Sequence, residues 1–262
     1  KDLTGVFQPG TLNSEPFNLN IDMDRIESIE DLRTCLSNSK AFRARQKRPF
    51  ITVSYAQSVD GSIASKNRLP IQLSGPESAV LTHQIRATND TILIGVGTLL
   101  ADDPRLTVRL AEGSNPQPIV LDTHLRTPVS ARLVTQSDLS PWIIKSQDNH
   151  SDQMKALKNA GATPLSCATS RDGKIDLHAL MAILNEKQVN SIMVEGGAKV
   201  ITSFVHSRLI DQFIITVSPR LVGGLPVIDS NGLNLNTDLT LGHVSYQRSG
   251  NDLIIWTRPD WK

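Results

Sequence analysis

The sequence predicts an α/β fold: a mostly parallel central sheet flanked by helices, with an antiparallel hairpin at the C-terminal end. Short apolar runs alternate with segments that repeat apolar residues every three or four positions, which is typical of strands that alternate with helices. The chain also has 16 Gly and 14 Pro among its 262 residues, and these break it often between the segments. The last apolar stretch, residues 244–258, turns at residues 249–252 and therefore predicts a hairpin.

Composition excludes several classes of protein. With 39% hydrophobic and 20% charged residues, the chain fits a globular protein and not a disordered, collagenous or coiled-coil one. Its 27 Lys and Arg against 26 Asp and Glu give a net charge of +1 without a long basic block, so nucleic acid is not an expected partner. The longest uncharged apolar stretch, residues 91–101, is well short of the roughly 20 residues that cross a membrane.

The two cysteines, Cys35 and Cys167, lie far apart and have no metal-ligand spacing. The sequence therefore predicts neither a disulfide framework nor a metal site. A reducing compartment such as the cytoplasm fits this cysteine usage best.

The first 47 residues are predicted to be an extension that precedes the main domain. Residues 1–20 are polar and interrupted by proline, whereas residues 22–42 place apolar side chains three and four positions apart. This spacing predicts one amphipathic helix, which a short cluster of basic residues ends just before Pro49. Residues 48–262 contain no internal repeat and no linker, so we expect them to form one domain.

The predicted elements of this domain follow one another in a regular order. The predicted strands are residues 50–55, 91–95, 118–122, 142–145, 191–195 and 213–218. The predicted helices are residues 76–87, 152–160, 177–188 and 198–208. Such alternation favours parallel strands for most of the sheet, and the final hairpin adds antiparallel strands at one edge.

Ligands of such sheets bind beyond the carboxyl ends of the strands, and three strand ends here carry candidate residues. In the first, residues 92–98, Gly95 and Gly97 would let the backbone approach a ligand and Thr98 offers a hydroxyl. Leu100 stands where a dinucleotide-binding fingerprint needs its third glycine. A tight structural turn is therefore an equal alternative.

The second strand end runs directly into a predicted helix. Gly196 and Gly197 precede Ala198, and they would expose the unpaired N–H groups of the helix start to an anion such as a pyrophosphate. The alternative is again a plain tight turn. Glu195 is the only carboxylate of this apolar run, so it either binds a polar group of a ligand or caps nearby backbone.

The third candidate is residues 102–109, where two carboxylates and two guanidiniums surround Pro104. A solvated loop of mutually paired charges would explain it equally well. Asp60, just after the first predicted strand, adds another polar side chain at a strand end. Because several polar clusters meet at one edge of the sheet, we favour a functional site.

Three sequence blocks resemble the signature of the riboflavin-biosynthesis pyrimidine reductases: PFITVSYAQSVDG at 49–61, GVGTLLADDPRLTVR at 95–109 and VEGG at 194–197. The resemblance extends over residues 48–258. It implies a dihydrofolate-reductase-like fold, NADPH as the cofactor and a homodimer. The implied reaction reduces the ribosylamino side chain of a pyrimidinone 5′-phosphate to a ribitylamino chain. Zinc-deaminase motifs, which accompany this reductase in bifunctional relatives, are absent, so a stand-alone reductase is expected.

The resemblance also implies which residues contact each ligand. The implied NADPH contacts are Ala56, Thr98, Asp102, Thr123, Gly197, Ala198, Lys199, Val200 and Ile201. The implied substrate contacts are Ser74, Arg86, Leu106, Arg109 and Glu195. The loop over residues 66–74 departs from the bacterial pattern, with Gln72 where a Trp often stands.

The implied chemistry is hydride transfer to C1′ of an opened ribosylamine, with a proton supplied to the nitrogen. Asp60, Asp102 and Glu195 are the candidate catalytic residues, and water is another proton source. Arg86 and Arg109 suit the substrate phosphate because a guanidinium makes paired bonds to phosphate oxygens.

Several alternatives stay open at this point. The substrate is either the diamino pyrimidine or its deaminated form. Arg126 and Lys199 are candidates for binding the 2′-phosphate of NADPH. Two other functions compete with the main one: a reductase of this fold that acts on a pterin, and a nucleotide-binding module without catalysis.

Overall fold

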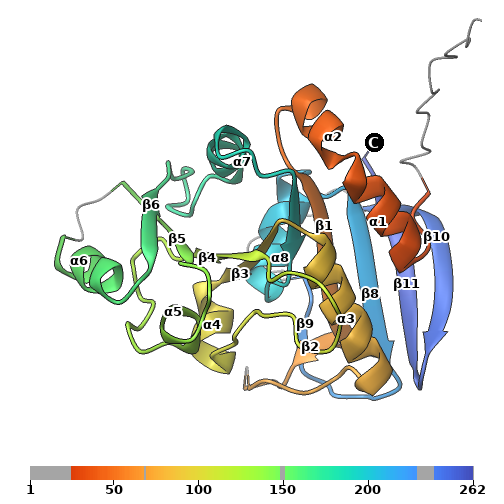
Figure 1. The fold of residues 1–262 in the computed structure, drawn as a ribbon. Helices are drawn as coiled ribbons and strands as arrows, with labels where there is room; N and C mark the ends of the chain where they lie inside the picture. Colours follow the sequence, from red (N-terminus) through yellow and green to blue (C-terminus); the bar gives the residue numbers. More distant parts are fainter. Residues whose placement is uncertain (1–24, 68, 148–150, 229–238, 262) are drawn as a thin grey trace, which may run out of the picture.

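The computed structural model describes residues 25–67, 69–147, 151–228 and 239–261. Its centre is a nine-stranded sheet with the strand order β10-β11-β8-β1-β7-β3-β4-β5-β6 (Figure 1). The seven strands from β8 to β6 are parallel, and the hairpin β10–β11 adds two antiparallel strands beside β8. The predicted fold class is therefore confirmed.

The strands of this sheet are β1 (Phe50–Ser58), β3 (Thr91–Gly95), β4 (Gln117–Leu121), β5 (Trp142–Lys145), β6 (Thr163–Ser166), β7 (Ser191–Val194), β8 (Gln212–Ser218), β10 (Thr240–Ser249) and β11 (Asp252–Asp260). A second, two-stranded sheet pairs β2 (Ser62–Ala64) with β9 (Leu225–Pro226). The helices are α1 (Ile29–Ser37), α2 (Ser39–Gln46), α3 (Pro76–Thr88), α4 (Val96–Asp102), α5 (Arg132–Thr135), α6 (Ser151–Asn159), α7 (Leu177–Glu186) and α8 (Ala198–His206).

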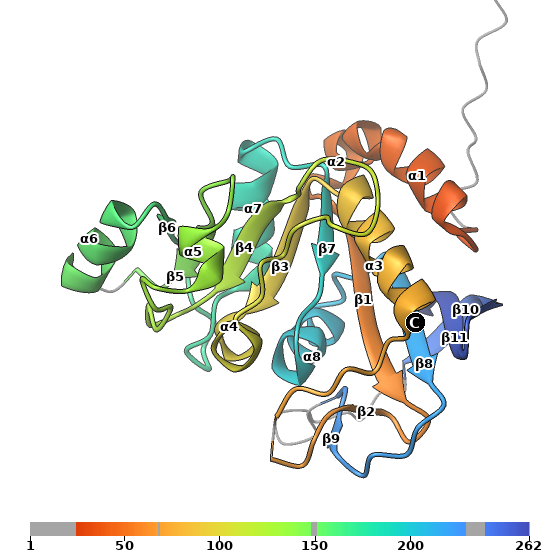
Figure 2. The ribbon, with the colours of Figure 1, turned by 60° about the horizontal axis from the view of Figure 1, so that its bottom comes forward.

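Helices cover both faces of the sheet because its buried strands are apolar on both sides. In β3, Ile92 and Ile94 belong to the same apolar cluster as α1, α3 and α5, whereas Leu93 belongs to the cluster of α7 and α8. Figures 1 and 2 show these two groups of helices on opposite sides of the sheet. In the described ranges, no helix combines the length and the apolar character that crossing a membrane requires.

The single helix that was predicted over residues 22–42 is wrong within the described residues. Two helices, α1 and α2, meet at Asn38, whose backbone leaves the helical conformation at φ −100° and ψ 6°. The side chains of Ser37 and Asn38 both donate hydrogen bonds to the carbonyl of Thr34. Such local bonds compete with the helical backbone pattern and favour a break at this point. Residues 22–24 lie outside the described residues.

The described part of the predicted N-terminal extension shares the core of the sheet. Leu32 and Phe42 are buried in the cluster that contains Ile85 of α3. Arg48 forms a two-point ion pair with Asp211, with N–O distances of 2.6 and 2.8 Å. The two helices therefore pack against α3 and against the start of β1, so they support the helix that carries Arg86.

Candidate active site

The candidate residues gather where β1 and β7 part. Strand β7 ends at Val194, which pairs with Val53, but β1 continues to Ser58 with only β8 as its partner. The edge of β1 that faces β7 is therefore unpaired beyond Val53. Ala56 lies on this unpaired part. Helices α4 and α8, which follow β3 and β7, begin side by side at the same edge of the sheet (Figure 2).

The four glycines at these two strand-to-helix junctions have two different roles. A Cβ on Gly196 would lie 2.5 Å from Val200 Cβ, and one on Gly95 would lie 2.7 Å from Val200 Cγ2. These two glycines therefore make room for a core side chain, which corrects the expectation that Gly95 lies open to a ligand. A Cβ on Gly97 would meet no atom within 4 Å, and one on Gly197 would meet only Thr98 Oγ1, at 3.2 Å.

The start of α8 is partly capped by its neighbour. The Gly197 N–H was expected to be unpaired, but it donates to Thr98 Oγ1 at 3.2 Å. Ala198 and Lys199 follow in the first turn, where N–H groups have no acceptor within the helix, and the N-cap residue, Gly197, has no side chain that could cap them. The side chains of Val200 and Ile201 are buried in the core, so a ligand at this helix start would contact backbone groups there.

Arg86 and Glu195, both predicted substrate contacts, bind each other. Arg86 Nε and Nη2 donate to the two carboxylate oxygens of Glu195 at 2.6 and 2.7 Å, and Nη1 donates to the carbonyl of Thr107 at 3.1 Å. Both side chains are mostly buried. Burial opposes the charge of Arg86, but the Glu195 carboxylate more than offsets this, so the pKa of Arg86 is raised. The pair holds the end of β7 and the loop after α4 against α3.

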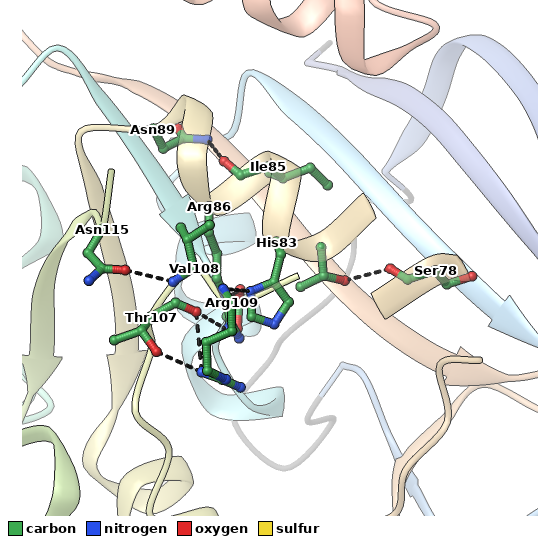
Figure 3. Close-up of polar contacts among 11 residues, drawn as sticks. Ser78, His83, Ile85, Arg86, Asn89, Thr107, Val108, Arg109 and Asn115 are labelled. Atoms are coloured by element: carbon green, nitrogen blue, oxygen red, sulfur yellow. Dashed lines mark hydrogen bonds and ion pairs between the residues drawn. The ribbon is translucent and has the colours of Figure 1, made fainter. Parts of the chain in front are cut away.

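Arg109 lies in the loop that Arg86 holds, and its guanidinium forms no ion pair with a carboxylate among the residues that the structure describes. It donates to Thr107 Oγ1 at 2.7 Å, and its own backbone N–H donates to His83 Nδ1 at 2.9 Å (Figure 3). Partial burial lowers the pKa of Arg109, and the positive charges of Arg86, Arg105 and Arg132 lower it further.

The hypothesis of a loop of mutually paired charges therefore does not describe residues 102–109. Within the described ranges, Arg105, Arg109 and Arg132 form no ion pair with a carboxylate. The Asp103 carboxylate instead accepts the backbone N–H of Arg132 at 2.9 Å and caps the start of α5. The result is a set of guanidiniums that form no ion pair within the described residues, which favours an anionic ligand.

His83 is a site residue that the sequence analysis missed. It lies on α3, three residues before Arg86, and is only 5% exposed. Burial lowers its pKa to about 4, the charges of Arg86 and Arg109 act in the same direction, and Glu195 opposes them. The ring is therefore neutral near pH 7. Its spacing from Arg86 on one helix face was the only sequence signal that could have indicated it.

Asp60, one of the three candidate catalytic residues, is exposed but accepts several hydrogen bonds. It accepts hydrogen bonds from Ser58 Oγ and Ser62 Oγ and from the backbone N–H groups of Val222 and Gly223. These bonds hold the pKa of Asp60 well below its usual range. Its surroundings favour the ionised form, which is the opposite of what a proton donor needs. The carboxylate ties the turn after β1 to the loop after β8.

The remaining predicted residues are spread along the edge of the sheet. Asp102 ends α4, and the surrounding protein raises the pKa of its carboxyl by desolvation. Leu106 is buried and has φ +56°, so it anchors the loop after α4. Thr123 follows β4, and its carbonyl accepts the Ser146 N–H. Ser74 precedes α3, at the opposite end of that helix from Arg86 and next to Gly75, which donates to Asp252.

Comparison with known proteins identifies the family. A family model described as the RibD C-terminal domain matches residues 49–255 of this chain. The chain belongs to this family. The resemblance that the three sequence blocks indicated is thereby confirmed, and it places the chain among the reductases of riboflavin biosynthesis.

Three relatives carry the name 2,5-diamino-6-ribosylamino-4(3H)-pyrimidinone 5′-phosphate reductase. The protein of Archaeoglobus fulgidus is 32% identical over 187 residues, which cover 68% of this chain and 83% of the relative. That of Debaryomyces hansenii is 33% identical, covering 69% of this chain and 79% of the relative. That of Methanothermobacter thermautotrophicus is 31% identical, covering 79% and 97%. By contrast, the chain spans 58% of the riboflavin biosynthesis protein RibD of Aquifex aeolicus, at 29% identity.

Two solved structures share the fold. The riboflavin biosynthesis reductase Rib7 of Saccharomyces cerevisiae superposes with a TM-score of 0.65 at 26% identity, covering 81% of this chain and 90% of that one. RibD of Acinetobacter baumannii superposes with a TM-score of 0.71 at 19% identity, covering 84% and 60%, and this likeness shows the fold alone.

Proposed function

We propose that this chain uses NADPH to reduce the ribosylamino side chain of 2,5-diamino-6-ribosylamino-4(3H)-pyrimidinone 5′-phosphate to the ribitylamino form. One observation carries the proposal: the guanidiniums around Arg109, which form no ion pair within the described residues, and the partly capped start of α8 lie along the same edge of the sheet. A substrate phosphate and a cofactor pyrophosphate are the anions that the two surfaces would attract.

The diamino form is proposed because the relatives that the chain matches over most of their length are named as reductases of the diamino compound. The relatives of which it spans 79% to 97% are named as reductases of that compound. The RibD protein of which it spans 58% is substantially longer. The deaminated pyrimidine is the second candidate, because the chain also matches RibD proteins and the resemblance leaves both forms of the substrate open.

The start of α8 has the chemistry that the phosphates of NADPH need. The N–H groups of Ala198 and Lys199 are available as donors, and the positive end of the helix dipole favours an anion there. Gly97 and Gly197 leave open space next to these groups, and Thr98 fixes the position of Gly197. NADPH bound here would supply the hydride. Lys199 and Arg126 are both exposed and remain the candidates for its 2′-phosphate.

The Arg109 loop has the chemistry that a sugar phosphate needs. Arg109 would bind the 5′-phosphate, with Arg105 and Arg132 adding positive charge nearby. Arg86 and Glu195 already satisfy each other, so they would fix the loop and the end of β7 and leave phosphate binding to Arg109. Desolvation raises the pKa of the Asp102 carboxyl, and we propose Asp102 as the first candidate proton donor to test.

Steady-state oxidation of NADPH with four substrates tests the proposal. We expect turnover with the diamino ribosylaminopyrimidine phosphate and a much higher KM for the same compound without its phosphate. The deaminated phosphate distinguishes the two substrate candidates, and dihydrofolate tests the pterin alternative. Binding of NADPH without oxidation of it by either phosphate would contradict the proposal and favour a nucleotide-binding module.

A further inference from the structure

Three side chains hold the backbone of the Arg109 loop. Residues 103–116 contain no helix or strand, so backbone pairing within a regular element does not fix their position. Arg86 donates to the carbonyl of Thr107, Asn115 Oδ1 accepts the N–H of Val108 at 2.7 Å, and His83 Nδ1 accepts the N–H of Arg109 (Figure 3). Three consecutive residues are thus each bound by a different side chain.

His83 is the member of this set that contacts Arg109 directly. It lies on α3 next to the buried Arg86–Glu195 pair, and α1 packs against this helix. Figure 3 shows the ring of His83 between the helix and the Arg109 backbone. A neutral imidazole that accepts through Nδ1 carries its proton on Nε2, so this hydrogen bond also fixes the tautomer.

We propose that His83 is a positioning residue for the substrate: its unprotonated Nδ1 holds the Arg109 backbone so that the guanidinium is placed to bind the substrate phosphate. The inference rests on the proposed function, because it assumes that Arg109 binds that phosphate. His83 itself contacts the loop and takes no part in the transfer of hydride or proton.

Protonation of His83 would undo this arrangement. The charged groups that face the ring are Arg86 on its own helix, Arg109 in the loop and Glu195 after β7. An imidazolium has N–H groups on both nitrogens, so Nδ1 could no longer accept from Arg109. It would also add a positive charge beside two guanidiniums. The neutral ring, and with it the position of Arg109, is therefore maintained near pH 7 and lost toward pH 4.

A pair of variants separates the hydrogen bond from mere packing. His83→Leu fills the site without an acceptor, whereas His83→Asn keeps an acceptor oxygen at the distance of Nδ1 from the backbone. With Leu we expect KM for the substrate to rise roughly fivefold or more, with kcat and the NADPH Kd nearly unchanged. With Asn we expect KM close to that of the native protein. A KM for the Leu variant equal to that of the native protein would overturn the link between His83 and substrate binding. Equally high KM values for both variants would overturn the role of the hydrogen bond.

Hydrogen exchange distinguishes a failure of this inference from a failure of the proposed function. The amides of residues 107–110 should exchange faster in His83→Leu than in His83→Asn, and this readout needs no substrate. Unchanged exchange in the Leu variant overturns the role of His83. Faster exchange with an unchanged KM supports the positioning of the loop and overturns the phosphate contact of Arg109.

The pH profile supplies a readout that packing alone would not move. As the pH falls toward 4, KM for the substrate should rise more steeply for the native protein than for His83→Asn. The titration of the substrate phosphate is common to both proteins, so it cancels in the ratio of their KM values. A ratio that stays constant with pH would overturn the protonation mechanism.

Discussion

The two sides of the candidate site are built from different parts of the chain. On the side of α4 and α8, the surface is backbone: glycines leave open space and N–H groups face it. On the side of α3 and the Arg109 loop, the surface is made of long charged side chains whose positions depend on other side chains. A larger side chain at a glycine should therefore block the backbone surface, whereas loss of one hydrogen-bonding side chain should displace the residues of the side-chain surface. Substitutions on the two sides should consequently affect different ligands.

The largest effect is expected from Gly197→Val, which adds a branched side chain where we place the cofactor phosphates. The extended backbone of Gly197, at φ −72° and ψ 175°, is one that valine adopts readily, so the fold should be kept. Loss of the charge-assisted bonds to the helix start should weaken NADPH binding roughly a hundredfold or more. Fluorescence titration with NADPH measures this.

Gly197→Ala is the matched variant for this prediction. Its Cβ would meet only Thr98 Oγ1, at 3.2 Å, so a small shift of that hydroxyl accommodates it. NADPH affinity should fall in the order Gly, Ala, Val. If circular dichroism and melting show an intact Val variant that binds NADPH as the native protein does, the phosphate assignment at α8 is wrong.

The next largest effect is a change in stability that distinguishes a glycine packed against the core from a glycine that faces open space. Gly196→Ala would place a Cβ 2.5 Å from Val200 Cβ, so the core must shift and the unfolding free energy should fall by roughly 1–3 kcal/mol. Gly97→Ala is the control, because its Cβ would meet no atom within 4 Å and α4 is helical there. The control should keep the native stability or exceed it slightly, because alanine forms helices more readily than glycine. Urea unfolding gives both values, and equal losses for the two variants would remove the distinction between these glycines.

The smallest effect is expected in how the unfolding free energy depends on pH, and it concerns His83 beside the Arg109 loop. The pKa of His83 is lowered from 6.5 to about 4, so below pH 6.5 the unfolded chain binds a proton that the folded chain excludes. The contribution of His83 to the unfolding free energy is therefore complete above pH 6.5 and decreases as the pH falls to about 4. His83→Asn lacks this contribution. Urea unfolding at pH 7 and pH 5 should show a larger loss for the native protein than for this variant, and equal losses would refute the assignment.

The sheet could be predicted from the sequence because its strands carry a strong local signal. Residues 92–94, for example, are a run of consecutive isoleucine and leucine, and such a run is typical of a strand that is buried on both faces. Helix α4 was missed because Gly97 lies within it and Gly95 precedes it, and glycine is a poor helix former. Its stability comes from packing, with Leu99 buried in the core, and packing is not visible in a local window.

The site could be predicted as a set of residues but not as a set of contacts. Arg86 and Glu195 are 109 positions apart, so only the fold shows that the guanidinium of one binds the carboxylate of the other. The same holds for the hydrogen bond from the Gly197 N–H to Thr98 Oγ1. It joins two strand ends that are far apart in the sequence. His83 left only a weak signal, its spacing from Arg86, because a hydrogen bond to the backbone requires no sequence motif.

The most direct test is whether Arg109→Ala weakens substrate binding without weakening NADPH binding. KM for the diamino ribosylaminopyrimidine phosphate and Kd for NADPH should be determined on the same preparation. Loss of a charged hydrogen-bond pair costs roughly 1.5–3 kcal/mol, so KM should rise about 10-fold to 150-fold while the NADPH Kd and kcat change little. Arg109→Lys should recover part of the loss, because it keeps the charge without the two-point geometry. An unchanged KM, or a loss of NADPH affinity in its place, would contradict the division of the site into a backbone side for the cofactor and a side-chain side for the substrate.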